Sequence, residues 1–237
     1  MDARDHNEAQ LELIRELFSQ CERRNVRFWL FGGWGIDALL GGVTRDHSDI
    51  DILVNAGSAE GLRSALQEMG GEVCDNGTGW RYEKNEIGID IGFLLTHADG
   101  TVVSDTDHDD SNVYPWPPGS FPEQCNGLLP GLSCRAVSWE AQYTAKAGYR
   151  NAFPDTTPRG KDEADLETIA RHVPATRRRE LEETVFGGIP RETVGVSGLQ
   201  SRNKPTSTFT AQTLNSGIFA TGSSAAIVNR FAGASLK

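Results

Sequence analysis

The stretch FGGWGIDALLGGVTRDHSDIDILV, residues 31–54, opens on a glycine pair and ends in an alternating apolar segment that contains Asp49 and Asp51. Side chains two apart on a strand point to the same side, so the two carboxylates share a face while the isoleucines and the valine face a core. Two like charges this close repel unless a cation or a proton lies between them. The segment therefore predicts a strand that carries half of a divalent-metal site, and carboxylate oxygens suit Mg²⁺ or Mn²⁺.

An isolated Asp-x-Asp has an alternative to the metal site: a strand face in contact with water, on which the two charges lie by chance. Asp90 favours the metal site, because it lies between Gly88 and Gly92 on the polar face of IGIDIGFLL, residues 87–95. Glycine inside a strand often marks a surface that another group approaches closely. If this strand lies beside residues 49–54, Asp90 becomes a third carboxylate around the same ions, which is the ligand set of two-metal phosphoryl transfer.

Gly32 and Gly33 lie between a short apolar strand, residues 27–31, and a predicted helix over residues 34–41. Such glycines let backbone N–H groups approach a phosphate, and the helix N-terminus adds a favourable potential. A simple tight turn is the other interpretation. The segment has neither the lysine and spacing of a Walker-type loop nor a G-x-G-x-x-G pattern, which excludes those two classes.

The remaining patterns predict strands in the first half of the chain and helices in the second. This order favours an α+β fold: a mixed sheet with flanking helices, followed by a small helical lobe. Residues 1–131 would form the sheet domain, 132–187 a strand and the lobe, and 188–237 a low-complexity tail without a catalytic role. The further elements expected are helices 8–24, 59–69 (capped by Ser58), 139–149 (capped by Ser138) and 161–172, and strands 79–84 and 133–137.

The 237-residue chain is acidic, with 33 Asp and Glu against 23 Lys and Arg and a formal net charge of −10. This balance argues against a nucleic-acid binder and suits metal ions or a cationic small molecule. The sequence has no apolar run of about 18 residues, and its first residues are polar, so we expect a cytoplasmic protein that does not bind membranes. Its 4 cysteines lie far apart in the sequence, and we expect them to be buried or free thiols in a reducing cytosol. The oligomeric state stays open.

The stretch FGGWGIDALLGGVTRDHSDIDI resembles the signature of antibiotic nucleotidyltransferases in the DNA-polymerase-β-like superfamily. Within it, the sequence is most similar to the aminoglycoside 2″-O-nucleotidyltransferase and lincosamide nucleotidyltransferase families. Weaker similarity extends through residues 119–141 and 161–169, so that the resemblance covers about residues 8–172. The family pattern falls on Gly32, Gly33, Trp34, Ile36 and Asp37, then on Thr44, Arg45, His47, Asp49, Ile50 and Asp51.

The resemblance implies a polymerase-β-like fold and a metal-dependent transfer of a nucleoside monophosphate, AMP from ATP or another nucleoside triphosphate, to a hydroxyl of an antibiotic. Asp49 and Asp51 would hold two Mg²⁺ ions, and Asp90 would complete one metal's shell or accept the proton of the attacking hydroxyl. The implied phosphate-binding and nucleotide-binding residues are Gly32, Gly33, Arg45, His47 and Lys161.

Alternatives stay open for several of these residues. Arg45 can be a surface charge, and His47 can be a structural histidine at a turn. Lys161 opens a helix, where a cation is unfavourable unless an anion such as a triphosphate faces it.

The nature of the acceptor also stays open. The acidic balance slightly favours a cationic aminoglycoside over a lincosamide, and the acidic segment DTDHDD, residues 105–110, with Trp116, would add negative charge to an acceptor cleft. A calcium loop is disfavoured there, because positions six and twelve hold Asp110 and Trp116. The other classes are a protein-modifying or antitoxin-type nucleotidyltransferase and a degenerate nucleotide-binding module.

Overall fold

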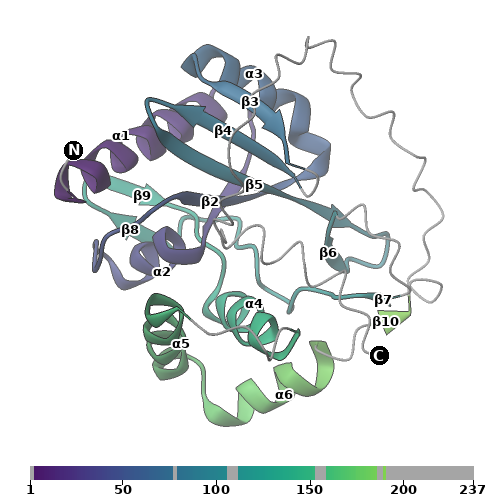
Figure 1. Ribbon diagram of the computed structural model, residues 1–237. Helices are drawn as coiled ribbons and strands as arrows, with labels where there is room; N and C mark the ends of the chain where they lie inside the picture. Colours follow the sequence, from purple (N-terminus) through teal and green to yellow (C-terminus); the bar gives the residue numbers. More distant parts are fainter. Residues whose placement is uncertain (1–2, 77–78, 106–111, 153–158, 186–188, 191–237) are drawn as a thin grey trace, which may run out of the picture.

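The computed structural model describes residues 3–76, 79–105, 112–152, 159–185 and 189–190, and its centre is a six-stranded sheet (Figure 1). The strand order is β1-β2-β5-β4-β3, with β6 paired to β5; only β2 and β5 run parallel, and the other pairs are antiparallel. The strands are β1 (Phe28–Phe31), β2 (Ile50–Asn55), β3 (Glu72–Asp75), β4 (Trp80–Lys84), β5 (Ile87–Thr96) and β6 (Val102–Ser104).

Two helices, α1 (Ala3–Glu22) and α3 (Ala59–Met69), contribute to the main core on one face of the sheet. The alternation of β2 and β5 sends Ile50, Ile52, Ile89 and Ile91 to this face, and each is 1% exposed or less. Burying one such side chain stabilises the fold by about 1.5–3 kcal/mol. The alternation of apolar side chains along these strands therefore determines which face of the sheet the helices cover. Helix α1 meets the core with Leu11, Ile14, Leu17, Phe18 and Cys21.

The opposite face of the sheet is partly apolar and partly polar. Trp29, Phe31, Leu53 and Leu94 form a second core there with Trp116, and helix α4 (Trp139–Ala152) adds Ala141 and Ala145 to it. Trp116 is 8% exposed and packs edge-on against Phe31, and its place in an acceptor cleft stays a prediction. Asp51 and Asp90 belong to the polar part of this face.

A helical lobe follows the sheet, and helix α2 (Gly32–Leu40) connects the two parts. Helices α4, α5 (Gly160–His172) and α6 (Ala175–Val185) share a small third core, to which α2 contributes Ile36. Helix α2 also contacts β2 and the hairpin of β8 (Gly127–Leu129) and β9 (Leu132–Cys134). Because α2 touches both parts, its N-terminus lies where the sheet and the lobe meet (Figure 1).

The predicted fold class is confirmed, and the helices and strands expected along the chain are found with shifts of a few residues. The Ser138 cap is confirmed by a hydrogen bond from Ala141 N to Ser138 Oγ of 3.2 Å. The Ser58 cap is wrong: residues Ala56–Ser58 form a 3₁₀ turn, and Ser58 at φ −98° and ψ 5° lacks the extended backbone that directs a capping hydroxyl onto the helix.

The structure bears only in part on three predicted features: the domain boundary, the tail and the acidic loop. The predicted boundary at residue 131 falls inside the β8–β9 hairpin, and the division into domains stays a prediction. The tail expected over 188–237 lies outside the described residues except for β10 (Ile189–Pro190), which pairs with β7 (Asn112–Val113). The acidic residues 106–110 of the expected acceptor loop also lie outside them.

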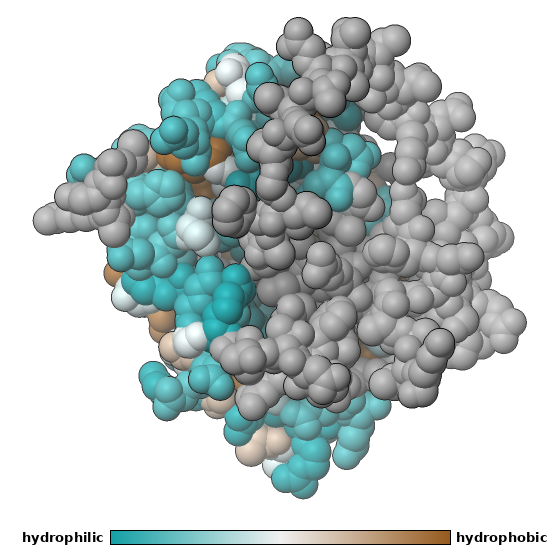
Figure 2. All heavy atoms as spheres, in the orientation of Figure 1, coloured by the Kyte–Doolittle hydropathy of each residue, from teal (hydrophilic) through white to brown (hydrophobic). Residues whose placement is uncertain are grey.

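On the face seen in Figure 2, the described residues are mainly hydrophilic, with small apolar patches between them. All four cysteines are free, and burial raises the pKa of Cys21 and of Cys134 to about 12, so these two thiols stay protonated at neutral pH. None of the helices in the described ranges combines the length and the apolar character that a membrane crossing requires.

Candidate active site

The centre of the candidate site is a row of side chains across four neighbouring strands. In this row Asp51 of β2 pairs with Asp90 of β5, flanked by Phe31 of β1 and Arg81 of β4. Neighbouring residues in register project to the same face of a sheet, so the two carboxylates lie side by side. Asp51 is 2% exposed and Asp90 is 5% exposed. The expected adjacency of the two strands is therefore confirmed.

Asp49 lies one residue before β2 and is only partly buried. Its Oδ1 accepts a hydrogen bond from Ser48 Oγ at 3.2 Å. The strand predicted over 49–54 thus begins one residue later, and Asp49 is the least buried of the three aspartates.

Asp90 has a basic partner, Arg81, that the sequence pattern does not indicate. Arg81 Nη1 donates to Asp90 Oδ2 at 2.7 Å, and Arg81 Nε donates to Glu83 Oε1 at 3.2 Å. Burial lowers the pKa of Arg81, but Asp90 and Glu83 outweigh that effect, and the pKa stays above its ordinary value. The guanidinium is therefore a fixed positive charge beside the carboxylate pair.

A metal ion fits the chemistry of this donor set, although the three predicted ligands do not form one compact group. No three His, Cys, Asp or Glu side chains within the described ranges lie close enough together to hold an ion. The register does bring two buried carboxylates together, and two like charges on neighbouring strands are the arrangement that a cation stabilises. The assignment of Asp49, Asp51 and Asp90 as metal ligands stays a prediction.

The glycine pair begins helix α2, with Gly32 in the left-handed region at φ 61°. A Cβ on Gly33 would lie 2.5 Å from His47 Nδ1 and 2.6 Å from Arg45 Nη2, so only glycine lets these two side chains lie against the helix start. Gln142 of α4 donates from Nε2 to Gly32 O at 3.3 Å and is fully buried. Gln142 thereby fixes the first peptide of α2, a role that the helical pattern of α4 does not signal.

Arg45 forms a two-pronged ion pair with Asp165 of α5. Its Nε and Nη2 donate to the two carboxylate oxygens at 3.1 and 2.9 Å, and its Nη1 donates to Asp46 O at 3.0 Å. The Arg45 side chain is 25% exposed, whereas that of Asp165 is 6% exposed. Arg45 therefore joins the loop after α2 to the helical lobe, and its contact with phosphate stays a prediction.

His47 is 4% exposed and has a partner at each ring nitrogen. Nδ1 lies 3.1 Å from Arg45 Nη1, and Nε2 lies 2.7 Å from Asp37 Oδ2. Because arginine can only donate, Nδ1 accepts and Nε2 carries the proton given to Asp37. The ring also packs on Trp34 with centroids 4.5 Å apart. These contacts support the structural alternative for His47, and nucleotide contact stays a prediction.

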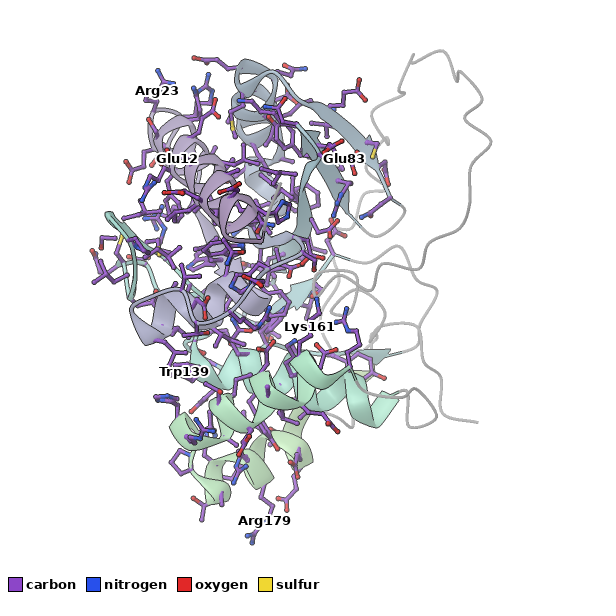
Figure 3. The ribbon with its side chains drawn as sticks, turned by 60° about the vertical axis from the view of Figure 1, so that its left-hand side comes forward. Glu12, Arg23, Glu83, Trp139, Lys161 and Arg179 are labelled. Carbon is purple, nitrogen blue, oxygen red and sulfur yellow. The ribbon has the colours of Figure 1, made fainter. Side chains whose placement is uncertain are left out.

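Lys161 lies at the start of α5, where the lobe faces the sheet (Figure 3), and Nζ donates to Ser48 Oγ at 3.1 Å. Deeper in the lobe, the buried Lys146 bonds Asp162 at 2.8 Å and Asp165 at 3.0 Å. Burial raises the pKa of Asp165, but Lys146 and Arg45 outweigh it and hold the pKa below its ordinary value. Helix α5 is thereby locked to the loop that precedes β2.

The sheet with its paired aspartates, the glycine-led helix beside them and the helical lobe define a class, the polymerase-β-like nucleotidyltransferases. Solved structures of this class support it. The crystal structure of ANT(2″)-Ia in complex with adenylyl-2″-tobramycin superposes with a TM-score of 0.61 at 26% identity, covering 74% of this chain and 95% of that one. The lincomycin-bound adenylyltransferase LnuA shares the fold, with a TM-score of 0.51 at 24% identity over 65% and 94% of the two chains.

The chain belongs to the aminoglycoside-2″-adenylyltransferase family, whose sequence profile matches residues 13–167. It is an enzyme of the nucleotidyltransferase class, as the resemblance implied. A 2″-aminoglycoside nucleotidyltransferase of Klebsiella pneumoniae is 32% identical over 135 residues, which are 56% of this chain and 70% of that protein. A lincosamide resistance protein of Staphylococcus haemolyticus is 38% identical over 145 residues, 60% of this chain and 85% of that protein.

Proposed function

We propose that the enzyme transfers AMP from ATP to a hydroxyl of an aminoglycoside antibiotic and so inactivates it, with pyrophosphate as the leaving group and the cytoplasm as the place of reaction. The observation that carries the proposal is the register of Asp51 with Asp90, two buried carboxylates on one face of the sheet. A binding module without catalysis has no need of two buried carboxylates on one sheet face, because burying each charge carries a desolvation cost.

Asp49, Asp51 and Asp90 would hold Mg²⁺, with Mn²⁺ as the other suitable ion. When bound, the metal would neutralise charge on the triphosphate and on the leaving pyrophosphate. Asp90 has one oxygen bonded to Arg81, and no described residue donates to the other oxygen. That oxygen is available to accept the proton of the acceptor hydroxyl, which general-base catalysis requires.

The triphosphate would lie between the start of α2 and the start of α5. The backbone N–H groups that follow Gly32 and Gly33 favour anions there. Lys161 supports this position, because its hydrogen bond within the described part of the chain goes to the neutral Ser48 hydroxyl and not to a carboxylate. Arg45 adds a positive charge beside the start of α2 and keeps a quarter of its side chain exposed.

The acceptor class follows from the family description and from charge. The K. pneumoniae relative is named for aminoglycosides, and the net charge of −10 favours a polycationic acceptor. A lincosamide is the second candidate, favoured by the higher identity, 38%, of the S. haemolyticus relative.

Pyrophosphate release tests the proposal when each nucleoside triphosphate is combined with aminoglycosides and lincosamides in Mg²⁺. We expect release with ATP that depends on an aminoglycoside. Release that depends only on a lincosamide would move the proposal to the second candidate. Release with neither class would contradict both.

A further inference from the structure

Arg81 lies directly opposite Asp90 in the β4–β5 pair and bonds the carboxylate on which the proposed function relies. The 2.7 Å contact is made through Oδ2 alone. The Arg81 side chain is 26% exposed and that of Asp90 is 7% exposed, so the ion pair is partly buried. An ion pair in such a place is screened less than a pair at the surface.

Gly88 shows that the guanidinium has a defined place on the sheet. Gly88 precedes Asp90 by two residues on the same face of β5. A Cβ at Gly88 would lie 1.8 Å from Arg81 Nη2 and 2.1 Å from Cζ, closer than any real contact. The guanidinium therefore lies directly over Gly88. An arginine that only extended into water would not require a glycine beneath it.

We propose that Arg81 is a positioning residue, which holds the Asp90 carboxylate in one orientation and supplies the counter-charge of the Asp51–Asp90 pair before metal and nucleotide bind. This inference rests on the proposed function. Because Arg81 takes Oδ2, it leaves Oδ1 as the oxygen for the metal or for the acceptor proton. Without Arg81, two buried carboxylates would lie side by side with less compensation, and Asp90 would lose the hydrogen bond that orients its carboxylate.

Thermal unfolding of the full chain, with and without MgCl₂ or MnCl₂, tests the charge role. Arg81→Met should lower the melting temperature without metal, and metal should restore part of the loss, so that the metal-induced rise exceeds that of the wild type. Gly88→Ala should act in the same direction with the net charge unchanged, because the new methyl group would take the place of the guanidinium. Glu83→Gln is the matched control, since it removes the other partner of Arg81 and should respond to metal like the wild type.

Kinetics test the positioning role. Arg81→Met should lower kcat about tenfold or more. If Asp90 is the general base, KM for ATP should change less than about twofold, and if Asp90 is chiefly a metal ligand, KM for ATP should rise as well. Arg81→Lys should recover part of the activity.

Equal losses of melting temperature with and without metal, together with an unchanged kcat in both Arg81→Met and Gly88→Ala, would overturn the inference and leave the proposed function intact. A wild-type protein that shows no metal-induced rise would overturn the metal site itself, and the role of Arg81 with it.

Discussion

Removing the Asp165 carboxylate should destabilise the protein strongly, although Asp165 lies outside the proposed chemistry. Asp165 is 5% exposed, and its carboxylate takes two hydrogen bonds from Arg45 and one contact from the buried Lys146. Breaking a buried pair by removing one partner typically costs 3–5 kcal/mol. Asp162 remains bound to Lys146 at 2.8 Å, so Asp165→Asn belongs at the lower end, about 3 kcal/mol.

For a chain of this size, about 3 kcal/mol corresponds to a fall in melting temperature of about 6–12 °C. Differential scanning calorimetry at neutral pH measures it, with Glu167→Gln as the control. Glu167 lies on the same helix in an exposed pair with Arg171, 3.6 Å away, and its loss should change stability by less than about 0.5 kcal/mol. A melting temperature for Asp165→Asn within about 1 °C of the wild type would refute the reasoning.

The pH dependence of this difference has a definite sign. The pKa of Asp165 is lower in the folded protein than in the unfolded chain, so its contribution is fully present above the ordinary Asp pKa of about 3.9. It is lost as the pH falls through the lower folded value. The stability difference between wild type and Asp165→Asn should therefore be constant near neutral pH and shrink in acid below about pH 4, as urea unfolding at several pH values would reveal.

Three further substitutions test the site itself. Asp51→Asn should leave the fold intact and reduce transfer to less than about a tenth in Mg²⁺, as pyrophosphate release would measure; higher residual turnover would sink its role as a ligand. Asp90→Asn should lower kcat by about 10²–10⁴-fold with ATP affinity unchanged if Asp90 is the general base, whereas weaker binding of Mg²⁺ and ATP would make it chiefly a ligand. Gly33→Ala should raise KM for ATP, because its methyl group would meet Arg45 and His47; an unchanged KM would separate these side chains from the nucleotide.

Much of the sheet and its polar row could be predicted because the alternation of apolar side chains is a local property. The alternation of apolar and polar side chains predicted that Asp51 and Asp90 lie on the polar faces of two strands, and both strands are present in the sheet. Their register is not local, since it depends on how β5 inserts between β2 and β4. Strand β3 was missed because its residues EVCD are mostly exposed and carry no apolar run.

The partners of the site residues were harder to predict, because they come from other elements. Asp165 lies 120 positions after Arg45, and Gln142 lies 110 positions after Gly32. An aspartate or a glutamine on an amphipathic helix is ordinarily a solvated residue, so its sequence context gives no sign of burial. Gly88 did carry a signal of close approach, but the sequence could not show that the approaching group is Arg81 and not a substrate.

The mass of the acceptor after reaction tests the central claim most directly. Purified enzyme, ATP and Mg²⁺ are incubated with an aminoglycoside, and the antibiotic is examined by mass spectrometry beside a reaction with the Asp51→Asn variant. The account predicts that the wild-type enzyme adds one AMP unit to the antibiotic and that the variant adds none. An unmodified aminoglycoside with the folded wild-type enzyme, or equal modification by the variant, would contradict it.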